Sequence, residues 1–394
     1  MNDSSARRIL FPLNPLYRLA LALRELSLLA PAQRLRYPVV SIGNLSTGGA
    51  GKTPLTVALA WSLERRGVQV DILSRGYGRE GNQALRVDEE GSAEEFGDEP
   101  LLMARETGAP VYVAPQRYDA GLLAEAEYEA EQAAARAEEK KQAQVDAVAS
   151  GGALPGKQET PENAMVLVKP ELEIGPFPAD SSAAAPSDPP TPVPPLVHLL
   201  DDGFQHRQLA RDVDILLLNS HDWKDWLLPA GNLREPLEAA RRADVIAIPA
   251  DEPELEVALQ MWGWEKPVWL LHRIMETPEV TGPVAAFCGI ARPEQFFAGL
   301  ESAGVEIAAR FAFPDHFTYT HSALDELLTN AKTAGAETLI TTEKDLARLG
   351  KQTEFLTKTM PLTTAHLRVK IEHQAEAIDW LIERLNAKQS PLSL

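Results

Sequence analysis

The sequence predicts an α/β fold in which a mostly parallel sheet carries helices on both faces, joined to a second, smaller α/β domain. Short apolar runs that read as strands alternate with helix-like stretches along most of the chain, and this alternation is typical of parallel sheets. The pattern restarts at about residue 284, and 394 residues with 44% hydrophobic side chains suffice for two cores. We therefore expect one domain over residues 1–281 and another over 282–394.

An amphipathic helix is predicted at the N-terminus, over about residues 9–30. Leucines and one alanine at helical spacing form its broad apolar face: Leu16, Leu19, Ala20, Leu23, Leu26 and Leu29. Arginines flank this face on a chain whose net charge is −19, and attraction to anionic lipid uses such an arrangement. The helix can equally pack on its own domain, and periodicity alone does not decide between the two.

Composition excludes several classes of protein. A net charge of −19 without a visible basic stripe argues against a nucleic-acid partner. The single cysteine, Cys288, excludes an internal disulfide and a thiolate metal cluster, and its apolar neighbours predict a buried free thiol. We expect neither a signal peptide nor a membrane span, and no motif indicates an obligate protein partner.

A phosphate-binding loop follows the first predicted strand, residues 38–42. It consists of a glycine-rich stretch that opens a helix reaching about residue 66: Ser46, Thr47, Gly48, Gly49, Ala50, Gly51, Lys52 and Thr53. Backbone N–H groups and the helix N-terminus favour an anion, Lys52 adds a charge, and the Thr53 hydroxyl can reach Mg²⁺. Ser46 stands where the strict pattern has glycine. ATP or GTP is the expected ligand, and the sheet is expected to be of the P-loop NTPase type.

A second strand over residues 68–73 leads to Ser74-Arg-Gly-Tyr-Gly-Arg79, and Gly97-Asp-Glu-Pro100 then opens a helix through about Thr107. Acidic residues in a first turn usually complement the helix dipole. From this pattern alone, Asp98 and Glu99 are therefore interpreted as capping residues. A strand follows at residues 111–114.

Residues 122–195 are predicted to be an insertion of low complexity. Residues 121–149 are rich in Ala and Glu and can extend as an exposed charged helix, whereas 151–195 contain eleven prolines and cannot build a core. The short apolar patch Val166-Leu-Val168 can form a strand. None of these residues carries recognisable chemistry.

An apolar strand resumes at Leu196 and ends in Asp201-Asp202. Two acids at the carboxyl end of a strand, downstream of a phosphate loop, predict a magnesium site. Further strands are expected at residues 213–218, 245–248 and 268–274, and in the second domain at 284–290, 307–313 and 338–342. Helices over 293–303 and 321–334 are expected between the strands of the second domain. Asp315-His316 follows one of these strands, and a lone loop histidine is more often structural than catalytic.

Seven motifs occur in one order along the chain. They are the phosphate loop, Ser-Arg-Gly-Tyr-Gly, Gly-Asp-Glu-Pro, Asp-Asp-Gly-Phe-Gln-His, Leu-Pro-Ala-Gly-Asn-Leu-Arg-Glu-Pro, Phe-Pro-Asp-His and Thr-Glu-Lys-Asp. This ordered set resembles the tetraacyldisaccharide 4′-kinases, the lipid A kinases of Gram-negative envelopes, over residues 9–121 and 196–385. The insertion departs from the family pattern but contains none of the motifs.

The resemblance implies ATP-dependent phosphorylation of the 4′-hydroxyl of a tetraacylated glucosamine disaccharide 1-phosphate, giving lipid IVA. The reaction would occur on the cytoplasmic face of the inner membrane, where the protein would be peripheral. ATP and Mg²⁺ are the implied cofactors, and the lipid substrate and the membrane surface are the implied partners. The competing hypothesis is a membrane-associated P-loop ATPase that acts as a nucleotide-gated binding or assembly protein.

Family roles are implied only at the matching positions. Lys52 and Thr53 match the phosphate-loop lysine and the magnesium ligand, and Arg234 matches an arginine of the site. Asp98 matches the acid that takes the hydroxyl proton, and His316 matches the histidine paired with it. Glu99 and Asp202 match acids around the metal, and Asp201 lies beside them as a further candidate ligand. The resemblance thus replaces the capping interpretation of Asp98 and the structural interpretation of His316.

Overall fold

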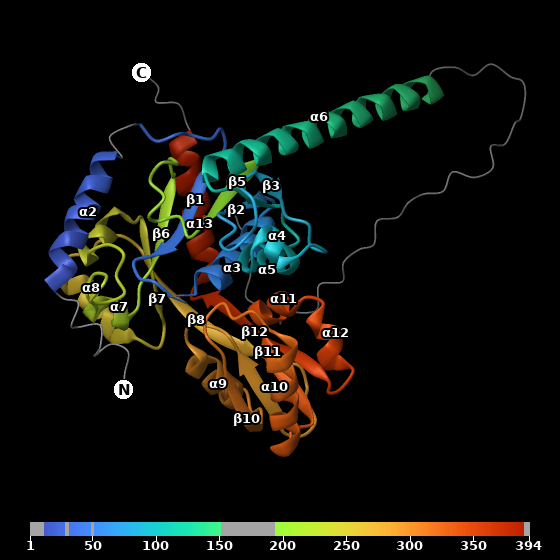
Figure 1. Ribbon diagram of the computed structural model, residues 1–394. Coiled ribbons are helices and arrows are strands. Elements are labelled where there is room, and N and C mark those ends of the chain that lie inside the picture. The colour runs from blue at the N-terminus through green and yellow to red at the C-terminus, as the bar shows by residue number, and fades with distance from the viewer. Residues whose placement is uncertain (1–11, 28–30, 49–50, 151–193, 390–394) are drawn as a thin grey trace, which may run out of the picture. The chain divides into compact units, whose positions relative to one another are not determined.

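The protein is described by a computed structural model that places residues 12–27, 31–48, 51–150 and 194–389 (Figure 1). Two compact units are distinguished by their internal contacts: Met1–Ala126 with Val193–Leu394, and Glu127–Pro192. Most of the predicted insertion, including Val166-Leu-Val168, lies outside the described residues. Its first part belongs to the helix α6, Arg117–Ser150, whose described side chains beyond residue 133 are exposed.

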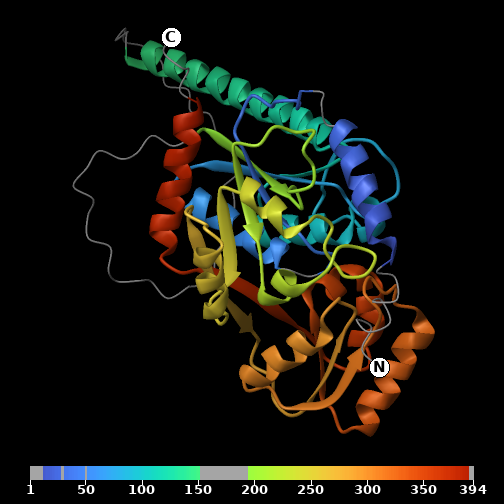
Figure 2. The same cartoon turned by 90° about the vertical axis from the view of Figure 1, so that its left-hand side faces the viewer.

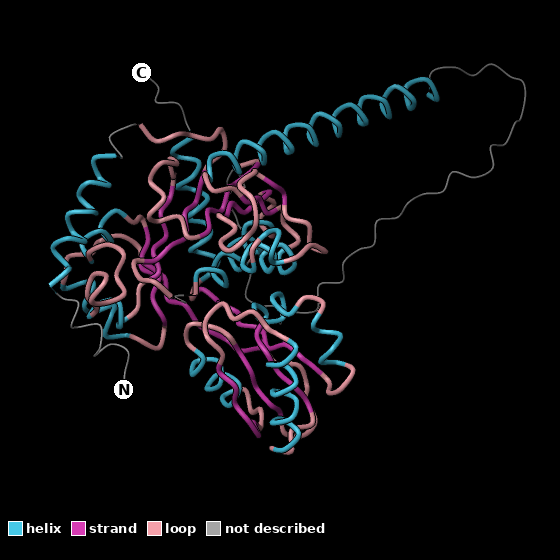
Figure 3. Tube along the Cα trace, viewed as in Figure 1, coloured by secondary structure: helices cyan, strands magenta, loops and turns pink. Residues whose placement is uncertain are grey.

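Twelve strands of the first unit form one sheet, in the order β10-β9-β11-β12-β8-β7-β6-β1-β5-β2-β4-β3. Figure 3 shows the strands in magenta. Their bounds are β1 Val39–Asn44, β2 Gln69–Ser74, β3 Leu85–Arg86, β4 Val111–Val113, β5 Leu196–Asp201, β6 Val213–Leu217, β7 Val245–Pro249, β8 Val268–Glu276, β9 Val284–Cys288, β10 Ile307–Ala312, β11 Thr338–Thr342 and β12 Leu362–Ile371. Among these pairs only β3–β4 and β8–β12 are antiparallel. The mostly parallel sheet is therefore confirmed.

Helices cover both faces of the sheet. Those of the first unit besides the start of α6 are α2 Asn14–Ser27, α3 Lys52–Glu64, α4 Ala93–Phe96, α5 Asp98–Thr107, α7 Ser220–Lys224, the 3-10 helix Leu237–Arg242, α8 Pro253–Met261, α9 Pro293–Ser302, α10 His321–Thr333, α11 Glu343–Leu349, α12 Gln352–Thr357 and α13 Gln374–Gln389. α13 packs on α3, β6 and β12 (Figure 2). Within the described ranges, no helix combines the length and apolar character needed to cross a membrane.

Alternation along the strands explains the two-sided core. On β6, Ile215 and Leu217 enter the core beneath α3 and α13, whereas Leu216 enters the core that also contains Leu255 of α8. Successive side chains of a strand point to opposite faces, so a strand buried on both faces reads as a continuous apolar run. The central strands could therefore be predicted from their continuous apolar runs.

The predicted second domain repeats this arrangement at the other end of the sheet. Phe287 of β9 packs with helices α10 and α12, whereas its neighbour Cys288 packs with α9. Cys288 is a buried free thiol, as predicted, and burial raises its pKa to about 12. β8 and β12 form the antiparallel ladder that joins these strands to the phosphate-loop part of the sheet. The boundary after residue 281 falls between β8 and β9 and remains a prediction.

Candidate active site

The phosphate loop lies between β1 and α3. β1 ends at Asn44 and α3 begins at Lys52, so strand, loop and helix follow one another as the motif requires. Gly51 has a φ of 92°, a left-handed conformation that glycine adopts without strain. Among the described residues no side chain caps α3, and the Lys52 ammonium donates to Asn44 Oδ1 at 3.2 Å. The N-terminal end of α3 therefore presents its backbone donors and a charge to an anion.

Residues at the start of the loop are held by the chain around Asn232. The Thr47 N–H donates to the Asn232 carbonyl at 2.8 Å. Ser46 is only 2% exposed, and its hydroxyl accepts a hydrogen bond of 3.2 Å from Asn44 Nδ2. The residue that departs from the strict motif is thus part of the packing beneath the loop. Residues 49–50, which are Gly49 and Ala50, lie outside the described part of the chain.

Two adjacent acids lie at the end of β5, Asp201 as its last residue and Asp202 directly after it. The sequence predicted this pair, but the surroundings of the two acids differ. Asp202 Oδ2 accepts from Arg234 at 2.9 Å, and its other oxygen lies 3.5 Å from Lys52 Nζ. Asp201 is 2% exposed, and within the described residues its Oδ1 has no hydrogen-bond partner. Burial, followed by the charges of Glu99 and Asp202, raises the pKa of Asp201 to about 7. One acid is paired with cations, and the other retains an unsatisfied oxygen.

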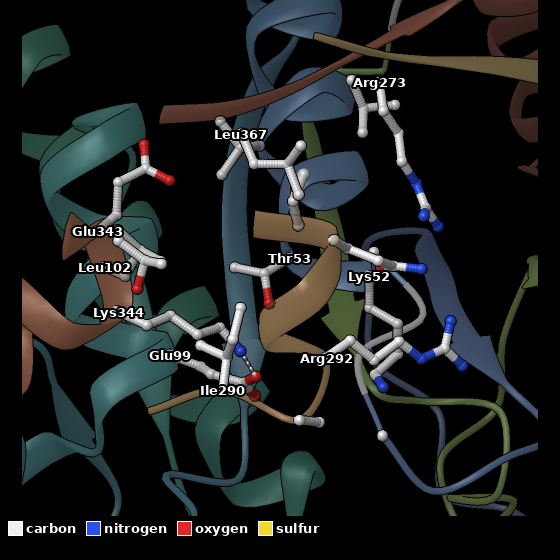
Figure 4. A pocket seen from close by; sticks show the side chains of 18 of the residues that line it. Lys52, Thr53, Glu99, Leu102, Arg273, Ile290, Arg292, Glu343, Lys344 and Leu367 are labelled. Atoms are coloured by element: carbon white, nitrogen blue, oxygen red, sulfur yellow. Dashed lines mark hydrogen bonds and ion pairs between the residues drawn. The ribbon is translucent and has the colours of Figure 1, made fainter. Parts of the chain in front are cut away.

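Glu99, in the first turn of α5, forms an ion pair with Lys344 of α11. Figure 4 shows the two side chains meeting on one side of the cavity, with Thr53 nearby. Although burial opposes protonation of Lys344, the charge and hydrogen bond of Glu99 raise its pKa. Glu99 therefore carries its own cation in this structure.

Asp98 and His316, more than two hundred residues apart, come together at the same cavity. His316 Nδ1 lies 3.2 Å from Asp98 Oδ2, and Arg348 of α11 donates to the same oxygen through Nε at 2.8 Å and Nη2 at 2.6 Å. Burial alone would raise the pKa of Asp98, but the His316 hydrogen bond and the Arg348 charge lower it. The Asp98 hydrogen bond in turn raises the pKa of His316.

A single cavity of about 1250 Å³ collects the predicted site residues. All the predicted site residues that the structure describes line this cavity, except Ser46. They are Thr47, Gly48, Gly51, Lys52, Thr53, Asp98, Glu99, Asp201, Asp202, Arg234 and His316. The phosphate loop, the acids after β5 and the Asp98–His316 pair therefore face one space. A cavity of this size exceeds the usual range for a single small ligand, which suits a nucleotide together with part of an acceptor.

Several cations of the cavity were not identified from the sequence. Arg273 of β8 and Arg292 lie on the same side as Lys52 (Figure 4), and Arg273 Nη2 would be 3.5 Å from a Cβ added to Gly51. Isolated arginines in a strand and a loop leave no local signal. Lys344 also lines the cavity and lies within the Thr-Glu-Lys-Asp motif, but the sequence assigned it no role of its own.

The family model and the curated relatives that match this chain carry the same description. The family model described as "Tetraacyldisaccharide-1-P 4'-kinase" matches residues 6–386. A tetraacyldisaccharide 4′-kinase of Koribacter versatilis (strain Ellin345) is 34% identical over 391 residues, covering 96% of this chain and 99% of that protein. One of Dechloromonas aromatica (strain RCB) is 32% identical over 398 residues, covering 97% and 93%.

A solved structure extends the similarity to the fold. The crystal structure of LpxK from Aquifex aeolicus in complex with ATP aligns with a TM-score of 0.62 and 28% sequence identity. The alignment covers 96% of this chain and 99% of that one. The similarity thus includes the strands before and after residue 281.

Proposed function

Because the chain belongs to the tetraacyldisaccharide-1-phosphate 4′-kinase family, it is an ATP-dependent kinase of the lipid A precursor, and we propose how its residues divide the reaction. One observation carries the proposal. The phosphate loop and the Asp98–His316 pair face the same cavity, so donor and acceptor groups are available to a single transfer step.

ATP is the donor and binds with its phosphates at the N-terminus of α3. The loop N–H groups and Lys52 hold the phosphate oxygens, as the helix dipole favours. Arg234 reaches the same space beside Asp202. Arg273 and Arg292 add charge on the Lys52 side (Figure 4). Phosphoryl transfer depends chiefly on such charge neutralisation and on positioning.

The residues present suit Mg²⁺. Asp201 has a buried oxygen without a hydrogen-bond partner among the described residues, and its raised pKa marks a place where a cation would be stabilising. We assign Asp201 as the principal ligand, because Asp202 is already paired with Arg234 and Lys52. Thr53 lines the same cavity and can join Asp201; Glu99 lines it too, but would have to exchange its Lys344 partner for the ion. When bound, the ion would neutralise charge on the phosphates.

Asp98 accepts the proton of the 4′-hydroxyl while the hydroxyl oxygen forms its bond to the γ-phosphorus. The bond from that phosphorus to the bridging oxygen breaks, and ADP leaves with the electron pair. His316 orients the carboxylate and stabilises its charge before transfer. Because His316 has a φ of 59° and lies in a loop, its placement depends on the surrounding packing.

The decisive experiment incubates the protein with Mg²⁺-ATP and the tetraacylated disaccharide 1-phosphate and measures the mass of the lipid. We expect a product heavier by one phosphate. Asp98→Ala should lower kcat by about 10²- to 10⁴-fold, the usual contribution of a general base, and His316→Ala should lower it by less. His321→Ala, an exposed histidine of α10, is the matched control. ATP hydrolysis without lipid phosphorylation would favour the ATPase hypothesis instead.

We propose further that the protein is peripheral on the cytoplasmic face of the inner membrane and that α2 is its contact. Leu16, Leu19 and Leu23 are 65%, 56% and 58% exposed, whereas the opposite side of α2 packs inward through Leu21 and Tyr17. The Tyr17 hydroxyl donates to the Arg234 carbonyl at 2.9 Å, so α2 borders the cavity. An exposed apolar face next to the site suits an acceptor that resides in a bilayer.

A flotation assay with vesicles containing phosphatidylglycerol tests this location. Replacing the three exposed leucines of α2 by serine should lower the membrane partition coefficient by about 10³-fold or more, because burial of each side chain in the membrane contributes about 1.5–3 kcal/mol. Leu122→Ser, an exposed leucine of α6, should leave binding unchanged. Unaltered binding of the triple variant would contradict the assignment of α2.

A further inference from the structure

Asp98 Oδ2 has two side-chain partners, and Arg348 donates two hydrogen bonds to it. Arg348 Nη2 also lies 3.3 Å from His316 Nδ1. Nε and Nη2 of Arg348 lie 2.8 and 2.6 Å from this oxygen, and His316 Nδ1 lies 3.2 Å away. Among the described residues, the other oxygen, Oδ1, accepts only the Glu99 N–H, at 3.0 Å. Asp98 and Arg348 are both 8% exposed at the side chain, whereas His316 is 44% exposed. Arg348 is thus the better-shielded partner of the carboxylate.

A buried acid, Asp345, holds the guanidinium of Arg348 through Nη1, the nitrogen that does not contact Asp98. Arg348 Nη1 donates to Asp345 Oδ1 at 3.2 Å and to the Gly289 carbonyl at 2.5 Å. Asp345 is fully buried and also accepts from the Tyr319 hydroxyl at 2.9 Å and the Gly289 N–H at 3.0 Å. These contacts belong to residues 289–348 alone. They orient the guanidinium independently of Asp98.

The Gly289 carbonyl connects both partners of Asp98. It accepts from Arg348 Nη1 and from the His316 N–H at 3.2 Å. A Cβ at Gly289 would lie 3.1 Å from Asp345 Oδ1, so the approach is close. The donors for Asp98 therefore form one preassembled group, and rigid donors lose little entropy when they meet their acceptor.

We propose that Arg348 is the positioning residue for Asp98 in the transfer reaction. This inference rests on the proposed role of Asp98 as the proton acceptor. The guanidinium, which stays charged at physiological pH, occupies Oδ2 and fixes the rotamer of the carboxylate, leaving Oδ1 for the acceptor hydroxyl. His316, with one donor and a more exposed ring, supplements this arrangement.

Steady-state kinetics of Arg348→Ala and Arg348→Lys test the inference. Misplacing a reacting group by about 1 Å costs about 10²-fold in rate, so Arg348→Ala should lower kcat by about 10²-fold and change KM for ATP and lipid by less than about threefold. Lysine keeps the positive charge but cannot donate two parallel hydrogen bonds as the guanidinium does. Arg348→Lys should therefore have a kcat between those of Arg348→Ala and the wild type. Arg310→Ala, which removes an exposed ion pair with Glu301, is the matched control.

Combining the substitution with Asp98→Asn separates positioning from general damage. If Arg348 acts through Asp98, its removal should cost less than about threefold in the Asp98→Asn background, because the two effects share one cause. Multiplicative losses would overturn the inference, as would an unchanged kcat for Arg348→Ala or an effect confined to KM. If Arg348→Ala does not fold, Arg348→Lys alone decides: a kcat equal to that of the wild type overturns the inference.

The two proposals fail in different ways. A wild-type protein that transfers no phosphate to the disaccharide overturns the proposed function and this inference with it. A wild-type protein that does so, together with an Arg348→Ala variant of equal kcat, overturns the inference alone.

Discussion

Replacing Asp201 by asparagine should stabilise the ligand-free protein while abolishing its activity. Asp201 is buried at the end of β5 with one oxygen unsatisfied among the described residues, and Glu99 and Asp202 are negatively charged neighbours. Asparagine has nearly the same shape and removes the charge. The substitution therefore separates the electrostatic cost of the site from its packing.

The magnitude follows from the pKa of Asp201, which burial and the neighbouring acids raise from 3.8 to about 7. That difference corresponds to an upper limit of about 4 kcal/mol by which ionised Asp201 destabilises the folded state above pH 7. The buried amide oxygen of asparagine would lack a hydrogen-bond partner, which reduces this stabilisation by about 1–3 kcal/mol. We expect a net stabilisation of about 1–3 kcal/mol for Asp201→Asn at pH 8.

The sign can be checked with pH. A carboxyl whose folded pKa is raised costs nothing below pH 3.8, where both states are protonated, and its full cost is reached above about pH 7. Urea unfolding in EDTA at pH 5 and pH 8 should therefore show the advantage of Asp201→Asn growing with pH. Asp325→Asn, on the exposed side of α10, is the control.

Two results would refute this reasoning. The first is an Asp201→Asn variant that is less stable than the wild type at pH 8. The second is a difference in unfolding free energy that does not change between pH 5 and pH 8. Ligand binding gives an independent measure, because a ligand that binds only the folded state raises its stability. Mg²⁺-ATP should stabilise the wild type more than the variant.

Two further predictions concern the sheet beneath the site. Gly43→Ala should cost about 1–3 kcal/mol of unfolding free energy in urea and lower kcat, because its Cβ would lie 2.6 Å from Phe204 Cβ and 2.8 Å from the Phe204 nitrogen; an unchanged unfolding midpoint would contradict the close approach. His198, buried between Asp71 and Glu125, has its pKa raised to about 9 by these carboxylates against the effect of burial. Protonated His198 contributes fully to the free energy of unfolding below about pH 6.5, and this contribution is lost as the pH rises to about 9. The difference in unfolding free energy between the wild type and His198→Gln should therefore shrink over that interval.

The central strands could be predicted because burial on both faces makes each of them a continuous apolar run. β1 and β5 are buried along their whole length. β12 was missed, since most of its residues are only half-buried and its partner β8 is about ninety residues away. Pairing over such a separation depends on contacts that no local pattern records.

Asp98 illustrates the limit for the site. Local reasoning interpreted it as a cap, and its Oδ1 does accept a backbone N–H in the first turn of α5, that of Glu99. The other oxygen faces His316 and Arg348. A first-turn acid can therefore serve the helix and the cavity at once, and only the contact across more than two hundred residues distinguishes the roles. The resemblance supplied His316 as its partner, whereas Arg348 required coordinates.

The distribution of charge around the cavity explains why stability and activity should oppose each other at Asp201. Every other acid considered has a cation of its own: Asp98 with Arg348, Glu99 with Lys344, and Asp202 with Arg234 and Lys52. A further lysine beside Asp201 would stabilise the ligand-free protein, but it would also remove the uncompensated charge that attracts a divalent cation. The unsatisfied carboxylate is thus a cost that the fold retains until substrate binds, and Asp201→Asn measures it directly.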